Sequence, residues 1–497
     1  MKYIIRYSGE MTTKSRIVRV QFCRQLKRNV ARVLRVRLGL PDQSVAPHDP
    51  DAVLLEVQWD NLHLELPASR RESVAEVESL LANMPGIWSF SRVLEYPLTD
   101  LQDLLDQTLA LYRERLTGKT FRVRCRRLGA HDFSSVDVER FVGAGLRLQT
   151  QARGVDLQAP DVVVPIEIRD ARVRVVDAAL PGIGGFPIGT QETAVSLLSG
   201  GFDSAVATYQ AMKRGLRAHT LFFNLGGRDH ELAVKELAYF LWQKFGASHP
   251  VRFISVPFEP VVAAILATIS DAMMGVVLKR MMLRVATEVA RQLDVGALVT
   301  GDSIAQVSSQ TLPNLCVIDE ATPLLVLRPL AMLDKQEIVD IARRIGTEEF
   351  SASIPEYCGV ISVRPTTRAK LSRIAEEERR FDFTLLEQAL ADRKTFDIRT
   401  LQSVSARPKA TELDTLTPQR SVILIDIRHP EQQERRPLRK PQYPVLLIPF
   451  FRLNAEFPKL ASDSNYLLYC DQGVLSRLHA AHLREQGHLN VGIFKTS

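Results

Sequence analysis

Two short segments of this 497-residue chain hold residue types whose spacing could do chemistry. The first, SGGFDS at 199–204, directly follows the apolar run AVSLL and precedes a predicted helix. Such a loop binds phosphate well, because the helix N-terminus offers free backbone N–H groups and glycines let a ligand approach closely. The segment therefore predicts an anion site formed by Ser199, Gly200, Gly201, Asp203 and Ser204.

This loop differs from a Walker loop, which carries a lysine to hold the phosphates. Its aspartate, Asp203, is chemically sensible beside a triphosphate if the carboxylate meets magnesium or caps the helix. The cation that the phosphates need must then come from another part of the chain. Considered alone, a Gly-Gly pair is also compatible with a purely structural turn.

The second segment is YLLYCDQGVLSR (466–477), in which Cys470 ends a predicted strand before a predicted helix at 475–487. Backbone N–H groups in such a loop can converge on the sulfur and favour the thiolate. A phosphatase would need Cys-x5-Arg, because a bidentate arginine holds the phosphate. Here Ser476 occupies that position and Arg477 comes one residue late, which argues against a phosphatase. A buried structural cysteine is the alternative.

Strands and helices alternate around the first segment, from about residue 193 to 395. This alternation predicts a parallel, doubly wound sheet whose first strand-to-helix loop is SGGFDS. The helices are expected at 204–214, 229–245, 259–270 and 275–292.

Glycine-rich, proline-rich and polar stretches predict the two ends of this region. PGIGGFPIGT (181–190) has four glycines and two prolines and predicts a hinge before it. The polar stretch 402–420 predicts a linker after it, and the last 80 residues predict a further α/β unit.

The net charge of +7 is concentrated in the N-terminal half. Residues 1–50 hold eleven Lys or Arg against three acids, most of them on one predicted helix, and FRVRCRRLGAHDF (121–133) is a second basic stretch. Two such clusters suit a polyanion that spans both, although solvated surface is the alternative. The candidate contacts are Arg122, Arg124, Arg126 and Arg127.

Composition excludes several protein classes. No apolar run approaches the roughly 18 residues that span a membrane, and the first residues lack a signal peptide. The five cysteines contain no Cys-x-x-Cys pair, which argues against a zinc or iron–sulfur site and against a disulfide framework. We therefore expect a cytoplasmic protein without a bound structural metal.

Several motifs together resemble a known family. SGGFDS resembles the signature of the PP-loop ATP pyrophosphatases, and GFPIGTQE, FFNLGG, LKRMM, ALVTGDSIAQVSSQT and PEYCGVIS extend the resemblance to the tRNA 4-thiouridine synthetase family, which also serves thiamine biosynthesis. RRLGAHDFSSVDVERFVGAGL resembles its tRNA-binding THUMP domain, and LIDIR followed by the Cys470 loop resembles rhodanese. The implied domains are an N-terminal ferredoxin-like domain (1–74), THUMP (75–179), the PP-loop domain (180–400), a linker (401–417) and rhodanese (418–497).

The resemblance also implies the roles of particular residues. ATP with Mg²⁺ would be bound, with Lys279 supplying the cation that the loop lacks. Asp302 stands where the family has Glu, so a shorter carboxylate occupies that position. The implied nucleotide contacts, besides the loop itself, are Leu197, Leu198, Phe222, Phe223, Lys279, Gly301 and Gln310.

The implied reaction adenylates uridine 8 of tRNA and transfers sulfur from a Cys470 persulfide, with Cys358 as the disulfide partner that completes release. A cysteine desulfurase would load the sulfur, and a sulfur-carrier protein of the thiamine pathway would be a second acceptor. One alternative is a PP-loop ligase of small metabolites, which leaves the basic half and the Cys470 loop unexplained. A tRNA-binding scaffold with degenerate sites is another, and the intact SGGFDS segment argues against it.

Overall fold

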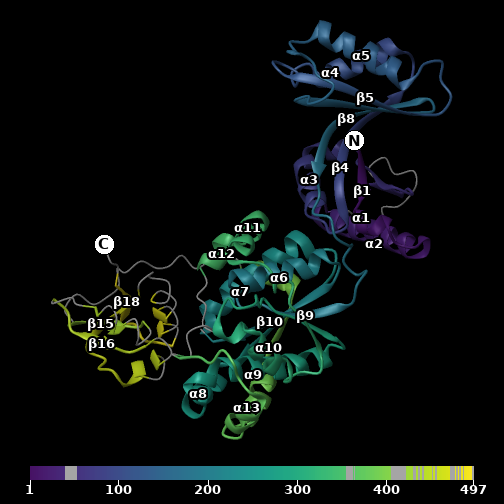
Figure 1. The fold of residues 1–497 in the computed structure, drawn as a ribbon. Coiled ribbons are helices and arrows are strands. Elements are labelled where there is room, and N and C mark those ends of the chain that lie inside the picture. Colours follow the sequence, from purple (N-terminus) through teal and green to yellow (C-terminus); the bar gives the residue numbers. More distant parts are fainter. Residues whose placement is uncertain are drawn as a thin grey trace. The chain divides into compact units, whose positions relative to one another are not determined.

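The computed structural model describes residues 1–39, 53–225, 227–353, 362, 364–404, 421–428 and parts of 433–494. The chain divides into two compact units, one formed by 1–190 with 213–215 and the other by 191–212 with 216–497 (Figure 1). The division falls at the end of the glycine-rich stretch 181–190. Among the described residues, none of the helices combines the length and the apolar character that crossing a membrane requires.

The first unit contains one continuous eight-stranded sheet in the order β2-β3-β1-β4-β8-β7-β5-β6. Its long strands β4 and β8 pair along almost their whole length, and β4 also pairs with β1. The sheet continues across the domain boundary that the resemblance implies at residue 74, because β4, which follows that residue, pairs with β1, which precedes it. The strands are β1 (Lys2–Tyr7), β2 (Leu54–Val57), β3 (Asn61–Glu65), β4 (Ile87–Pro97), β5 (Thr120–Leu128), β6 (Gly154–Val155), β7 (Val162–Arg169) and β8 (Arg172–Pro181).

The described helices of this unit lie over one face of the sheet, and the opposite face, called the open face below, carries none of them. α4 (Leu101–Tyr112) and α5 (Ser135–Gln149) lie over the β5 end of the sheet (Figure 1) and share an apolar core with it. The predicted basic helix is α2 (Arg16–Arg37), whose residues Leu26, Val30 and Val33 are buried. The remaining helices of this unit are α1 (Gly9–Thr12) and α3 (Val74–Ala82).

The second unit contains the predicted doubly wound sheet, in the order β13-β12-β9-β10-β11-β14. The first five strands are parallel, and the edge strand β14, which the sequence did not predict, runs antiparallel to β11. The bounds are β9 (Thr193–Leu197), β10 (Arg217–Asn224), β11 (Arg252–Pro257), β12 (Ala297–Val299), β13 (Leu325–Leu327) and β14 (Lys394–Asp397).

The four helices predicted for this sheet are present. They are α6 (Phe202–Lys213), α7 (Gly227–Leu241), α8 (Glu259–Thr268) and α9 (Met274–Gln292). α7 continues as a π-helical turn at Trp242–Gly246, so the predicted end at 245 is close to the observed one. Further helices follow: α10 (Leu312–Asp319), α11 (Lys335–Ile345), α12 (Glu348–Ser353), α13 (Leu371–Glu378) and α14 (Thr384–Ala391).

The C-terminal part has a separate parallel sheet in the order β16-β15-β17-β18. Its strands are β15 (Val422–Asp426), β16 (Val445–Leu447), β17 (Asn465–Tyr469) and β18 (Val491–Ile493). Most of the predicted linker and about half of the predicted helix 475–487 lie outside the described residues.

Candidate nucleotide site, basic surface and sulfur site

The SGGFDS loop lies at the carboxyl end of β9, between β10 and β12, where the strand order reverses. This topological switch point is the place where doubly wound sheets bind ligands. Gly200 has a φ of 98°, a conformation that favours glycine. α6 begins at Phe202, two residues earlier than expected, so Asp203 lies in the first turn of the helix instead of capping it.

The hydroxyl of Ser204 holds the loop in shape. It accepts hydrogen bonds from the backbone N–H and the hydroxyl of Ser199, both at 3.1 Å, and donates to the carbonyl oxygen of Gly201 at 3.0 Å. Ser204 is buried, whereas Ser199 is exposed. Ser204 thus uses its proton within the loop, and Ser199 is the serine that lies open to a ligand.

A second loop approaches the first through Gly301, which directly follows β12 and Thr300. A Cβ atom at this position would lie 2.7 Å from both the carbonyl carbon of Asp203 and the amide nitrogen of Ser204. The close approach at Gly301 therefore packs this second loop on the first turn of α6. Any larger residue would push the start of α6 away from the site.

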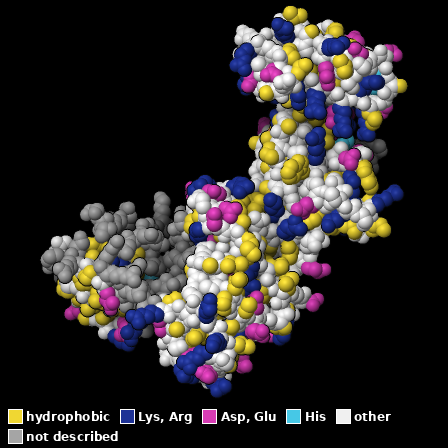
Figure 2. Space-filling model, in the orientation of Figure 1, with side chains coloured by type: hydrophobic (Ala, Val, Ile, Leu, Met, Phe, Trp, Pro, Cys, Tyr) yellow, Lys and Arg dark blue, Asp and Glu magenta, His cyan; other side chains and the backbone are white. Residues whose placement is uncertain are grey.

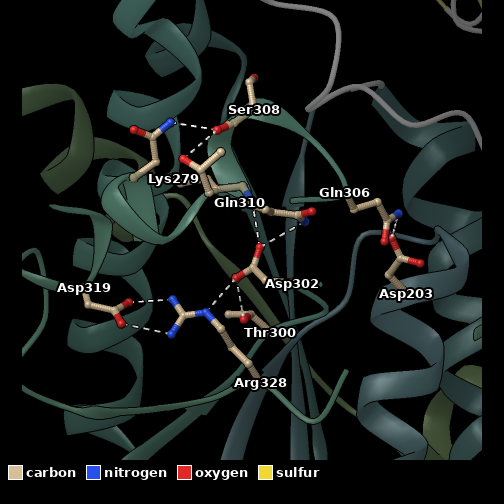
Figure 3. A network of polar contacts seen from close by, with 11 residues as sticks. Asp203, Lys279, Thr300, Asp302, Gln306, Ser308, Gln310, Asp319 and Arg328 are labelled. Carbon is tan, nitrogen blue, oxygen red and sulfur yellow. Dashed lines mark hydrogen bonds and ion pairs between the residues drawn. The ribbon is translucent and has the colours of Figure 1, made fainter. Parts of the chain in front are cut away.

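Asp302 is the centre of a buried polar cluster beside this junction (Figure 3). Its Oδ1 accepts from Nζ of Lys279 at 2.7 Å and from Nε2 of Gln310 at 3.3 Å. Its Oδ2 accepts from the hydroxyl of Thr300 at 2.7 Å and from Nε of Arg328 at 3.2 Å. Burial alone would raise the pKa of Asp302, but these donors, with Lys279 foremost, lower it to about 2.

Asp203 has partners that the sequence did not suggest. Its carboxylate accepts from Nε2 of Gln306 and from Nζ of Lys335, both at 2.8 Å (Figure 3 shows the first of these). Lys335 is the first residue of α11, whose N-cap Asp334 forms a capping box with Glu337. The Lys335 side chain is about half exposed (48%), whereas Lys279 is largely covered (22%). Two lysines therefore lie near the SGGFDS loop: Lys335 bonds Asp203 directly, and Lys279 bonds the neighbouring Asp302.

The apolar residues expected at the nucleotide lie at the ends of β9 and β10. Leu198 is buried and Leu197 is partly exposed. Phe222 packs edge-on against His230 of α7, with ring centroids 4.8 Å apart, while Phe223 packs on Phe258 and joins the core on the other side of the sheet. Both rings cannot wall one pocket, because successive residues of a strand point to opposite faces.

Three of the four candidate RNA-binding arginines share the open face of the first sheet. Arg122, Arg124 and Arg126 alternate with the buried residues of β5. Arg127 has the opposite parity and turns to the helix side, where it donates to the carbonyl of Gly129 and lies 2.9 Å from Nδ1 of His131. The expectation of one patch of four is therefore corrected to three, and the period-2 alternation of β5 already contained this signal.

The open face carries further charge across the sheet. Arg126, Glu167, Arg174 and Glu95 are directly opposite one another on β5, β7, β8 and β4, so their side chains form one row on the same face. Lys2, Arg172 and Arg174 all bond Glu95, at 2.8, 2.9 and 2.7 Å. Figure 2 shows Lys and Arg side chains gathered over this part of the first unit. The row itself is neutral, and Lys2 and Arg172 beside it make this part of the face positive.

Cys470 directly follows β17 and is buried. Its sulfur lies 3.4 Å from the backbone nitrogen of Ser476 and 3.5 Å from the Ser476 hydroxyl oxygen, so a backbone N–H does point at the sulfur as expected. Cys358 lies outside the described residues. Burial raises the pKa of Cys23, and burial with nearby Glu139 raises that of Cys125 to about 11, so both are thiols of low reactivity.

Comparison with known proteins identifies the family. The family model of the thiamine biosynthesis protein (ThiI) matches residues 189–383, and that of the THUMP domain matches residues 99–176. The tRNA sulfurtransferases of Azotobacter vinelandii and Pseudomonas syringae pv. syringae are 50% and 48% identical to this chain, with the full length of both chains covered in each case. This chain belongs to the tRNA sulfurtransferase family.

Solved structures agree with this membership of the tRNA sulfurtransferase family. A 4-thiouridine synthetase, solved as an RNA complex with bound ATP, covers 80% of this chain and 99% of its own with a TM-score of 0.68 and 26% identity. PH1313 from Pyrococcus horikoshii covers 70% of this chain with a TM-score of 0.52, and at 21% identity it shows the fold alone.

Proposed function

We propose that this chain is an ATP-dependent tRNA sulfurtransferase that converts uridine 8 of tRNA to 4-thiouridine. The observation that carries the proposal is the convergence at the switch point of a doubly wound sheet, where Lys335 bonds Asp203 of the SGGFDS loop and Gly301 brings the Asp302–Lys279 pair beside it. Membership of the tRNA sulfurtransferase family and the THUMP match support tRNA as the substrate.

The uridine O4 is a poor leaving group, so the oxygen must be activated before sulfur can replace it. In the proposed reaction O4 attacks the α-phosphate of ATP and pyrophosphate leaves, and sulfur then displaces AMP at C4. The free N–H groups at the start of α6 and the two lysines stabilise the negative charge that the phosphates carry through this step. Gln310 and one of the phenylalanines, or their backbone, would orient the nucleoside.

Mg²⁺ fits the residues present. Asp203 lies in the first turn of α6, directly after the loop, and one carboxylate together with phosphate oxygens and waters is the usual environment of this ion. Bound there, Mg²⁺ would neutralise phosphate charge. Hydrogen bonds from Lys335 and Gln306 fix the orientation of the Asp203 carboxylate.

The open face of the first sheet is the proposed tRNA surface. Arg122, Arg124 and Arg126 would contact phosphates, and Arg172 and Arg174 extend the same face toward the N-terminal strands. Contacts of this kind fix the position of the RNA and carry little sequence information. On this proposal, residues 1–74 and 75–179 act together as one RNA-binding element, and the enzyme works in the cytoplasm.

Sulfur would arrive as a persulfide on Cys470 of a rhodanese domain at 418–497, joined by the linker 401–417. A cysteine desulfurase loads this persulfide, the outer sulfur goes to C4, and the Cys358 thiolate attacks the inner sulfur to leave a Cys470–Cys358 disulfide, which a thiol reductant then opens. The same persulfide would serve the sulfur-carrier protein of thiamine biosynthesis.

The test is nucleoside mass spectrometry of tRNA from cells that lack the protein. Loss of 4-thiouridine, its return with the wild-type chain and its continued absence with Asp203→Ala are expected. A normal 4-thiouridine content in the deleted strain would contradict the proposal.

A further inference from the structure

The Lys279 ammonium has two anionic partners in the proposed function, the Asp302 carboxylate and the phosphates of ATP, and its single charge cannot neutralise both. It is 2.7 Å from Oδ1 of Asp302, yet the proposed function needs it at the phosphates of ATP. A buried carboxylate that loses its only counter-ion is costly to keep ionised. Lys279 can therefore turn to the nucleotide only if another cation neutralises Asp302.

Arg328, which directly follows β13, is placed to be that cation. Its Nε donates to Oδ2 of Asp302, the oxygen that Lys279 does not use, at 3.2 Å. Its two terminal nitrogens donate to both carboxylate oxygens of Asp319 at the end of α10, at 2.9 and 2.5 Å. The Arg328 side chain is only 13% exposed, so this fork holds the guanidinium rigidly against Asp302 (Figure 3).

A second observation at the same cluster points to a ligand. Gln310 is buried, and its Nε2 donates to Oδ1 of Asp302, which fixes the orientation of the amide. The amide oxygen Oε1 is then buried and has no hydrogen-bond partner among the described residues. A fixed acceptor with no partner in the described part of the chain suits a donor on a bound ligand, such as a ribose hydroxyl or the adenine amino group.

We propose that Arg328 is a positioning residue of the nucleotide site: it neutralises Asp302, so that Lys279 is free to bind the ATP phosphates while Gln310 stays aligned. The inference rests on the proposed function, since it takes Lys279 and Gln310 as nucleotide contacts. It also gives Asp302 a role, which is to orient two nucleotide contacts without touching the nucleotide.

The test compares variants of the full-length protein for affinity toward an ATP analogue with a methylene bridge between the α- and β-phosphates. Arg328→Met is expected to weaken binding about tenfold, because Lys279 then stays on Asp302, and Arg328→Lys to recover part of the loss. In steady-state thiolation the KM for ATP should rise by a similar factor while kcat changes less than about twofold. The matched control is Arg284→Met, which removes another paired arginine of the same domain (Arg284 to Glu378, 2.9 Å) and should leave both values unchanged.

A double-mutant cycle separates positioning from mere support of the fold. If Arg328 acts through Asp302, adding Arg328→Met to Asp302→Asn should cost little more than Asp302→Asn alone. Additive effects, or an Arg328→Met variant that binds the analogue normally, would overturn the inference. Lys279→Met distinguishes this result from a failure of the proposed function. If Lys279→Met binds the analogue normally, the role of Lys279 itself is contradicted. If Lys279→Met binds weakly and Arg328→Met binds normally, only the role of Arg328 is overturned.

Discussion

The Nζ atom of Lys335 lies 2.8 Å from Oδ1 of Asp203, although the two residues are 132 positions apart in the chain. The pair joins the start of α11 to the start of α6, so a half-exposed cation lies beside the loop that the sequence marks as the phosphate site. A cation in this position can move from the aspartate to a phosphate oxygen when ATP binds.

Changes at Asp203 and Lys335 should impair the activation of tRNA by ATP and leave the loading of sulfur on Cys470 intact. Asp203→Ala is expected to reduce tRNA thiolation by at least about 100-fold, and Lys335→Met by at least about tenfold, because both act on the triphosphate. Sulfur transfer from a desulfurase to Cys470 should be unchanged in both variants. Lys394→Met, at an exposed lysine of β14, is the matched control. Loss of labelled sulfur on Cys470 in Asp203→Ala would show that the two steps do not occupy different domains.

The open face of the first sheet should bind tRNA mainly through phosphates. Reversing Arg122, Arg124 and Arg126 to Glu should weaken tRNA binding and reduce the slope of log K against log salt by about 2 to 3, while ATP binding is retained. Arg127→Glu is the internal control, because this side chain turns to the helix side of β5. Equal losses of tRNA affinity in Arg127→Glu and in the variant with the other three arginines reversed would mean that the open face does not determine tRNA binding.

A fragment of residues 405–497 should fold alone and accept sulfur. It has a four-stranded parallel sheet, and the buried members of its apolar cluster all lie between Ile425 and Val491. Circular dichroism and persulfide loading of Cys470 by a desulfurase are the measurements. The fragment should also support thiazole formation in cells that lack the full chain. An insoluble or unreactive fragment would place the boundary elsewhere.

One turnover without reductant should leave a disulfide between Cys470 and Cys358. Peptide mapping by mass spectrometry after a single turnover is the measurement, and Cys358→Ala should keep ATP binding and persulfide loading but lose most multiple turnover. The exposed Cys316 on α10 is the alternative partner. A Cys470–Cys316 bond, or no bond, would refute the assignment to Cys358.

His230 should make the stability of the PP-loop domain depend on pH. Burial lowers its pKa to about 4, against 6.5 for a free imidazole, while Nε2 lies 3.3 Å from the carbonyl oxygen of Ser199 in the loop. The unfolded chain binds the proton first, so the stabilisation is complete above pH 6.5 and is lost toward pH 4, with a slope of at most about 1.4 kcal/mol per pH unit.

Urea unfolding of the full chain at pH 4.5, 5.5 and 6.5 tests this, followed by Trp242 fluorescence after the exposed Trp59 and Trp88 are changed to Phe. His230→Gln should flatten the pH dependence and weaken ATP binding. His219→Gln, whose imidazole also has its pKa lowered by burial to about 4 but lies at the start of β10, should flatten the pH dependence and leave ATP binding intact. If the free energy of unfolding keeps the same dependence on pH in both variants, the two histidines are not its cause.

Local pattern was enough to predict much of this molecule. The helices α6 to α9 and the parallel strands between them follow from hydrophobic periodicity, which a short window of residues determines. The phosphate loop is equally local, because six consecutive residues set its flexibility and its place before a helix. The alternation along β5 likewise determines which of its arginines share a face.

Strand order and long-range contacts determined the rest. The antiparallel edge strand β14 and the continuous sheet through β4 and β8 depend on which strands meet, and neither is encoded in a local period. Lys335 reaches Asp203 because β9 and β12 are neighbours although about a hundred residues separate them, and Arg328 reaches Asp302 because β13 pairs with β12. The sequence alone thus determined where phosphate could bind, whereas the tertiary structure decided which distant charges hold that site, because Coulomb and hydrogen-bond energies depend on distance in space.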